Sequence, residues 1–298
     1  MTRRLRIPGL VDLIRIDDPA VIAAASADAR LDRDFSGGGP LINRWIAGRI
    51  RRSLRTPTAP LPSVSPRDHP GRAEQQAALQ SRLGALVSKG AVATDHVAEL
   101  AAYVRGERPE SAVGPLVQEA IGRLFADRYS SSDHTWRAAC VLDAAPRNMN
   151  PLRALWWAVT GALRRAQHVL SDAAGGDSAG VHATAVAVHS LVRSLRQMRR
   201  LWLEPGLRDR ITTDAAVMRS LRAPESVPRR WSAPASTIWG NLPAGTLALF
   251  ELDAARARDP DADIIFMAAS WSRCPAAAWT TALLKDVWKR AQSGETAL

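Results

Sequence analysis

The hydrophobic pattern of this 298-residue chain changes at about residue 72, and this change constrains the fold more than any other feature. Beyond it, apolar residues recur at three- and four-residue spacing, which is typical of amphipathic helices. The spacing predicts helices over 72–88, 93–105, 112–127, 132–143, 150–173, 180–203 and 213–222. We therefore expect a mainly α protein.

The segment 150–173 carries the clearest periodicity of these helices. Its apolar positions form one stripe and are predicted to face the core. They are Leu152, Leu155, Trp156, Val159, Leu163, Ala166 and Leu170.

The first 71 residues have a different character. Residues 11–16 alternate as a strand does, Asp18 and Pro19 suit the cap and first position of a helix, and 41–54 is helical in pattern. Residues 56–71 hold five prolines and predict an extended internal loop.

A second change occurs between residues 232 and 251. A turn around Trp239 and Gly240 leads into a strand that ends near Phe250. Because no repeat and no convincing linker is present, we expect one helical domain over 1–298. It would have a small β and loop region before its C-terminal helix.

Charge and hydropathy indicate a soluble, cytoplasmic protein. Hydrophobic residues make up 46% of the chain, and no apolar run reaches the length of a membrane span. The net charge is +11, and all but three of the 40 basic residues are arginine. These arginines are spread along the chain without interleaved aromatics, which favours a solvated surface over nucleic-acid binding. An acidic protein partner remains open.

The two cysteines lie in different settings and do not form a disulfide framework. Cys140 lies in an apolar helical segment and is expected to be a small buried side chain. Cys274 follows an apolar approach and a small-residue loop, and a helix is expected directly after it. A helix N-terminus lowers a thiol pKa, so Cys274 is a candidate nucleophile or metal ligand, including an axial heme ligand. A structural role is the alternative.

Three further motifs precede this loop. They are Asp68-His69-Pro70-Gly71-Arg72 after the proline-rich loop, Ala179-Gly180-Val181-His182-Ala183-Thr184 at the start of a long helix, and Ala223-Pro224-Glu225-Ser226-Val227-Pro228-Arg229 after a short helix. Together with the Cys274 loop, their order resembles that of the cytochrome P-450, or heme-thiolate, superfamily. The resemblance spans about residues 68–292 and implies a compact P-450-like fold.

The resemblance implies heme, iron protoporphyrin IX, as the cofactor. Cys274 would be its axial ligand, and His69, Arg72 and Arg229 would contact its propionates. Arg229 would lie in a turn. Trp271 beside the thiol would shield the sulfur from water or serve in the core.

His182 and Thr184 would form the distal proton-handling pair. The sequence departs from the family here, because His182 stands in place of an acid and Ala183 in place of a threonine. An imidazole can take a proton from a bound peroxide and return it to the leaving oxygen. The cysteine loop also departs, with Ser270 and Ala276 where the family has glycine.

The resulting hypothesis is a heme-thiolate oxidoreductase in a bacterial biosynthetic setting, acting on a small or medium organic substrate. Its chemistry would be monooxygenase-like or peroxide-dependent. An acidic ferredoxin-type partner would dock on Arg273, Lys285 and Lys289. One alternative is a histidine-ligated heme oxygenase using His182 or His189. The other is a non-catalytic helical binding or scaffold protein.

Overall fold

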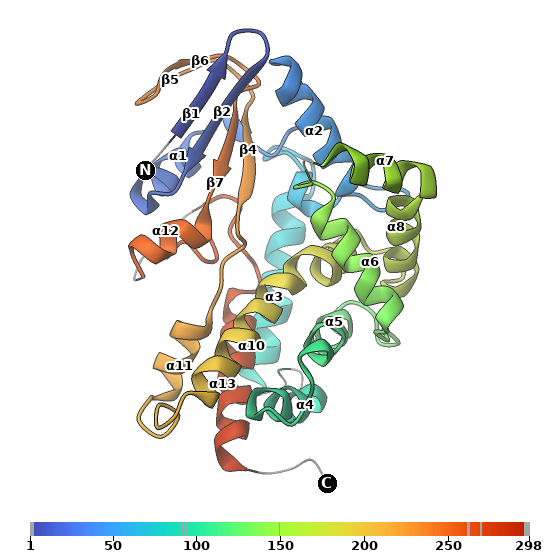
Figure 1. Cartoon of the computed structure of the whole chain (residues 1–298), viewed down its shortest axis with the longest axis vertical. Helices are drawn as coiled ribbons and strands as arrows, with labels where there is room; N and C mark the ends of the chain where they lie inside the picture. Colours follow the sequence, from blue (N-terminus) through green and yellow to red (C-terminus); the bar gives the residue numbers. More distant parts are fainter. Residues whose placement is uncertain are drawn as a thin grey trace. The chain divides into compact units, whose positions relative to one another are not determined.

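The computed structural model describes residues 3–90, 92, 94–148, 150–260, 263–268 and 270–294 (Figure 1). Its internal contacts divide the chain into two compact units. The first, here the β unit, comprises 1–72, 144–163 and 223–274; the second, the helical unit, comprises 73–143, 164–222 and 275–298. The single domain expected from the sequence stays a prediction.

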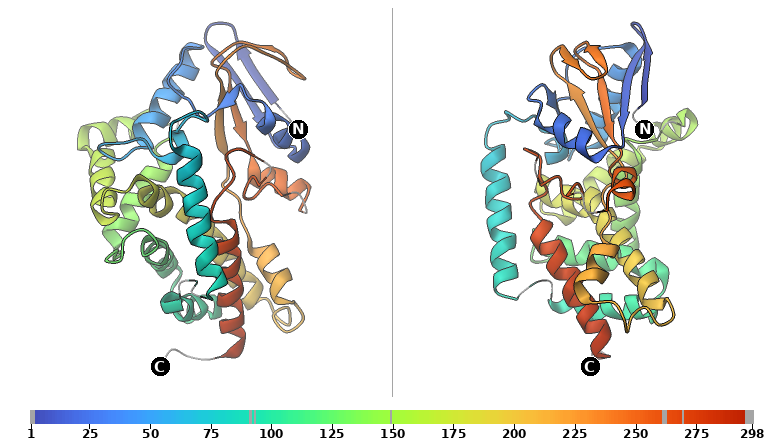
Figure 2. Two further views of the ribbon diagram at one scale, coloured as in Figure 1. Left: turned by 180° about the vertical axis from the view of Figure 1, so that it is seen from behind. Right: turned by 90° about the vertical axis from the view of Figure 1, so that its left-hand side faces the viewer.

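The β unit contains a five-stranded sheet built from both ends of the sequence (Figure 2). Its order is β1-β2-β7-β4-β3, and β2 pairs with β7 in parallel while the other pairs are antiparallel. The strands are β1 (Arg3–Ile7), β2 (Val11–Ile16), β3 (Leu31–Asp32), β4 (Val227–Trp231) and β7 (Leu247–Phe250). The strand predicted at 11–16 is confirmed, whereas β1 and β3 were not foreseen. β1 is largely exposed, so it lacks the alternating apolar pattern of a half-buried strand.

The register of β3 and β4 determines which charged residues meet. Leu31 pairs with Trp231 and Asp32 with Arg230. Continuing this antiparallel register by one residue brings Arg33, just after β3, opposite Arg229. Residues almost 200 positions apart in sequence are therefore neighbours.

The remaining elements of the β unit are short. They are α1 (Pro19–Ala27), α2 (Leu41–Ser53), η1 (Pro62–Val64), α7 (Pro151–Thr160), α12 (Leu252–Arg258) and the hairpin β5 (Ala235–Thr237) with β6 (Gly240–Leu242). The side chain of Asp18 caps α1 by accepting from the Val21 amide at 3.1 Å, as the sequence predicts. The proline-rich loop contains one 3₁₀ turn, η1.

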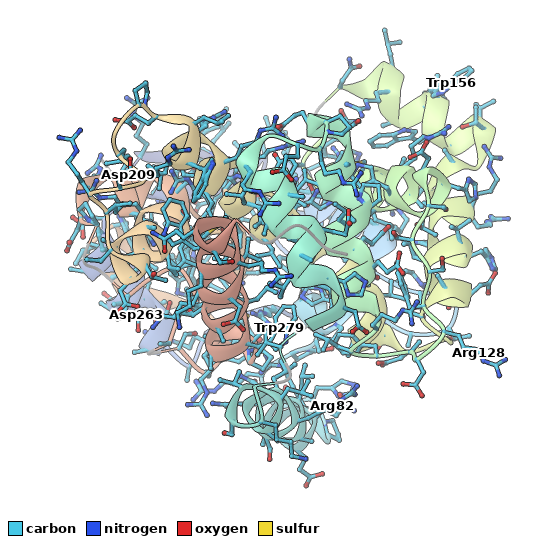
Figure 3. The ribbon with its side chains drawn as sticks, turned by 90° about the horizontal axis from the view of Figure 1, so that it is seen from below. Arg82, Arg128, Trp156, Asp209, Asp263 and Trp279 are labelled. Carbon is cyan, nitrogen blue, oxygen red and sulfur yellow. The ribbon has the colours of Figure 1, made fainter. Side chains whose placement is uncertain are left out.

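The helical unit is formed around α4, α5, α10, α11 and α13, which pack against one another (Figure 1). Trp202 of α10 and Trp288 of α13 meet edge to face with ring centroids 5.4 Å apart. Trp279 of α13, labelled in Figure 3, is 2% exposed. The helices that lie wholly or mainly in this unit are α3 (Arg72–Ser88), α4 (Thr94–Arg105), η2 (Glu110–Ala112), α5 (Val113–Gly122), α6 (Asp133–Ala144), α8 (Ala162–Ala173), α9 (Ser178–His182), η3 (Ala183–Ala187), α10 (Val188–Leu203), α11 (Thr213–Ser220) and α13 (Ala277–Ser293).

The long helix predicted over 150–173 is wrong in one respect, because Gly161 breaks it. Gly161 has φ +64°, a left-handed conformation that ends α7 before α8 begins. The predicted core stripe fails at the same point: Leu152 is 75% and Trp156 66% exposed, whereas Leu170 is buried. Figure 3 labels Trp156 on this helix. A periodic apolar pattern places residues on one face, but it does not identify what that face packs against.

The helix predicted over 180–203 is continuous but not uniform. Its first part, α9, passes into a π-helical segment, η3, before α10. Among the described residues, no helix combines the length and the apolarity that crossing a membrane requires.

Candidate functional site

The loop that carries Cys274 folds back on itself within the β unit. The Cys274 amide donates to the Phe266 carbonyl at 2.8 Å, and the Ser270 amide donates to that of Met267 at 2.8 Å. Met267 has φ +50°, which is uncommon for a residue with a side chain. The loop is therefore a compact turn that fixes the backbone at Cys274.

Two serines stabilise this loop, and one of them, Ser270, stands at a position where the resemblance implied glycine. Ser270 and Ser272 are both buried, and their hydroxyl oxygens lie 2.9 Å apart. The Ser272 amide also donates to Ser270 Oγ at 3.1 Å. Side-chain hydrogen bonds thus do part of the work of shaping the turn.

Arg229 lies beside this loop, in strand β4 and not in the turn that the resemblance implied. Its Nη2 donates to Ser272 Oγ at 2.9 Å, and its Nη1 donates to the Pro228 carbonyl at 2.8 Å. The side chain is 3% exposed. Burial first, and then the charge of Arg72, lower the pKa of Arg229 to about 9. A buried cation of this kind calls for an anion.

Arg72 and Trp271 lie together in the same unit. The Arg72 guanidinium is 4.2 Å from the centroid of the Trp271 ring, a cation–π distance. Burial lowers the pKa of Arg72. The structure therefore brings Arg72, Arg229, Trp271 and the Cys274 loop into one cluster, while their contacts with heme stay a prediction.

Arg33 belongs to the same cluster, although the sequence analysis missed it. Its guanidinium lies 5.4 Å from the Trp271 ring centroid, and its Nη2 donates to the Ser272 carbonyl at 3.3 Å. Arg33 also interacts electrostatically with Cys274. In the sequence, Arg33 is one of many arginines and is flanked by Asp32 and Asp34, so nothing distinguishes it. Only the pairing of β3 with β4 shows that it lies beside Arg229.

His69 was predicted to contact a heme propionate, but among the described residues the structure shows only a local contact for its side chain. It is exposed, and its Nδ1 is 2.9 Å from the carbonyl oxygen of Pro70. This contact is local, because it joins His69 to the residue that follows it. A propionate contact by His69 stays a prediction.

The distal candidates belong to the helical unit. His182 ends α9, and Thr184 lies in the π-helical segment, fully buried, with its hydroxyl donating to the Gly180 carbonyl at 2.8 Å. Gln118 of α5 donates to the Thr184 carbonyl at 3.1 Å. π-Helical segments are frequent at functional sites.

Cys140 is exposed, which corrects the expectation of a buried side chain. It is on the outward side of α6, whereas Ala138, Ala139 and Leu142 provide the buried positions. Neither cysteine forms a disulfide. Among the described residues, no three His, Cys, Asp or Glu side chains gather as a group that could hold a metal ion.

Solved structures of cytochromes P-450 share the fold of this chain. The chain is similar to a myxobacterial cytochrome P-450, CYP267B1, in complex with myristic acid (17% identity, 96% of this chain and 83% of that chain, TM-score 0.58). It is also similar to CYP175A1 from Thermus thermophilus (16%, 97% and 83%, TM-score 0.58) and to the tirandamycin C-bound P-450 monooxygenase TamI (17%, 96% and 84%, TM-score 0.57). No family model and no curated protein matches the sequence. The chain has a cytochrome P-450-like, mainly α fold, as predicted.

Proposed function

We propose that this protein is a heme-thiolate oxidoreductase that oxidises a small or medium organic substrate. One observation carries the proposal: on a P-450-like fold, the buried Arg229 and the half-buried Arg33 and Arg72 gather in the same unit as the Cys274 loop. The donor set fits heme, because guanidinium groups bind carboxylates well and a thiolate binds iron.

Each group of the cluster has a distinct part in holding heme. Cys274 would ligate the iron, while Arg72 and Arg229 would donate hydrogen bonds to the propionates. Trp271, stacked on Arg72, would hold that guanidinium in place and keep water from the sulfur. When bound, heme supplies the redox chemistry that inserts oxygen into an unreactive substrate or oxidises it at the expense of peroxide.

His182 and Thr184 would serve the proton transfers of this reaction. A neutral imidazole accepts a proton near physiological pH and returns it as imidazolium, and the Thr184 hydroxyl can relay a proton. An oxidant of either kind, dioxygen or peroxide, needs such groups. With dioxygen, an acidic ferredoxin-type partner would deliver the electrons.

The first prediction concerns the axial ligand. Protein expressed with heme supplementation should contain heme, and its ferrous carbon monoxide complex should show a Soret band shifted far to the red. Cys274→Ser should lose this band because a hydroxyl replaces the thiolate. Cys140→Ser is the matched control, since Cys140 is exposed and should leave the spectrum unchanged.

The spectrum also separates the alternatives. A band retained in Cys274→Ser would exclude this cysteine as the ligand and favour ligation by His182 or His189. Wild-type protein that remains colourless and fails to bind added hemin would contradict the proposal and favour a non-catalytic scaffold.

A further inference from the structure

Arg33 is held by the fold in a position that gives its charge no adequate partner. Its Nε is fully buried and has no hydrogen-bond acceptor among the described residues. Its two other hydrogen bonds are long, 3.4 Å to the Pro62 carbonyl and 3.3 Å to that of Ser272. No ion pair joins its guanidinium to a described carboxylate. A half-buried arginine whose Nε is enclosed in this way destabilises the protein unless an anion joins it.

The surroundings of Arg33 increase this cost. Burial first, and then the charges of Arg229 and Arg72, lower the pKa of Arg33 well below its ordinary value, whereas Asp32 and Cys274 act in the opposite direction. The Asp32 carboxylate already accepts the backbone amide of Arg67 at 2.9 and 3.2 Å and the amide of Arg33 itself. The Asp32 oxygens therefore accept hydrogen bonds from backbone amides and not from the Arg33 guanidinium.

Trp271 positions two of the three guanidinium groups. Arg72 lies 4.2 Å and Arg33 5.4 Å from the centroid of its ring. Cation–π contacts with one indole hold two like charges near each other before any ligand arrives. The third group, on Arg229, is fixed by strand β4 and by Ser272.

The charges of the cluster match one ligand. Three guanidinium groups against the carboxylate of Asp32 leave two positive charges. Heme carries two propionate carboxylates, and its ferric porphyrin core has the single positive charge that a Cys274 thiolate would offset. We infer that Arg33 is a third propionate-binding residue, donating to heme carboxylate together with Arg72 and Arg229. This inference rests on the proposed function.

The experiment compares Arg33→Met with Arg30→Met. Methionine keeps the aliphatic stem and removes the charge; Arg30 is exposed and ion-paired with Asp28, so its replacement is the control. Hemin titration of the apoprotein should show that Arg33→Met binds about tenfold to a hundredfold more weakly, as expected for the loss of one charge-assisted hydrogen bond. Arg30→Met should bind like wild type.

Two further measurements test the reason for this effect. Thermal unfolding of the apoprotein should show that Arg33→Met is at least as stable as wild type, because it removes a half-buried charge that is not ion-paired. Hemin dimethyl ester, which lacks the propionate charges, should bind wild type and Arg33→Met with similar affinity.

The outcomes are separable. If wild type binds hemin and Arg33→Met binds it equally well, the inference is wrong while the proposed function stands. If Arg33→Met is less stable as apoprotein, or loses affinity for the ester to the same extent, Arg33 has a structural role and the inference is again wrong. If wild type binds no hemin, the proposed function itself fails.

Discussion

Two adjacent arginines in strand β4 have opposite surroundings. Arg230 is satisfied by backbone carbonyls, with Nη1 at 3.2 Å from Asp34 and Nη2 at 2.7 Å from Gly38. A Cβ at Gly37 would collide with this guanidinium, which would have to shift from its present position. Arg229 points to the other face of the strand and reaches the Cys274 loop through Ser272. Arg230 therefore stabilises the fold, whereas Arg229, its neighbour in sequence, contacts the Cys274 loop.

The second prediction belongs to the residue scale: the stability of the apoprotein should depend on pH through Arg229. The pKa of Arg229 is about 9 in the folded state, well below the ordinary value that the guanidinium has in the unfolded chain. Between these values the unfolded chain holds more protons, so the stability contributed by this group rises with pH. Below about pH 9 both states are charged and the cost of burial is fully present.

The measurement is the free energy of unfolding of wild type and Arg229→Met at about pH 7.5 and about pH 10.5. The difference should move in favour of wild type at the higher pH, by at most about 1.4 kcal/mol per pH unit. Arg208→Met, at an exposed residue, should show a constant difference from wild type. A constant difference for Arg229→Met as well would mean that the guanidinium stays protonated throughout.

At the scale of elements, the long helix formed by α9, η3 and α10 is interrupted where the distal candidates lie. A π-helical turn inserts a residue into the regular i→i−4 ladder and changes the direction of nearby side chains. Gln118, which is fully buried, supports this turn through the Thr184 carbonyl and also accepts from the Thr135 hydroxyl at 2.9 Å. The interruption is therefore built into the packing between helices.

The third prediction belongs to this segment. His182→Gln should lower peroxide-dependent turnover by about 10²- to 10⁴-fold, because glutamine can hydrogen-bond but cannot exchange a proton near neutral pH. Its hemin affinity and its spectrum should stay as in wild type. His168→Gln, at an exposed position on α8, should have normal turnover. Unchanged turnover in His182→Gln would exclude this histidine from proton transfer.

Element positions were largely predictable, while their boundaries at special residues were not. The predicted bounds 72–88 and 11–16 match α3 and β2 because apolar spacing and a clear turn or loop define both ends. The break at Gly161 depends on a left-handed backbone conformation. Glycine allows this conformation but does not require it, so the sequence alone does not predict the break. The exposed face of α7 depends on partners elsewhere in the chain.

At the scale of the whole molecule, the net charge is +11. Basic residues that are ion-paired within the chain contribute less to the attraction of an acidic partner than exposed ones without a close acid. Lys285 of α13 is ion-paired with Asp214 at 2.8 Å, so part of its field is cancelled nearby. Lys289, one turn later on the same helix, is exposed. Of the two lysines on α13, Lys289 is therefore the better candidate for an acidic partner.

The fourth prediction tests this partner. Lys289→Glu should slow reduction by an acidic ferredoxin about threefold to tenfold at low ionic strength, because reversing one charge weakens electrostatic steering. The difference should shrink at high salt. Lys89→Glu, an equal change at an exposed position after α3, is the control. Equal slowing by both variants would indicate a general charge effect and no docking by α13.

The sequence by itself determined the mainly α character, the strand at 11–16 and the order of motifs that ends at Cys274, because spacing and turn residues act locally. It also singled out Arg72, Arg229 and Trp271 as heme contacts, a role that stays a prediction, and the structure places these residues in one cluster. Only the tertiary structure decided that Arg33 joins them, that Arg230 does not, and that Cys140 faces solvent. These outcomes depend on the pairing of β3 with β4 and on which face of each helix is covered, and such long-range contacts leave no periodic trace in the sequence.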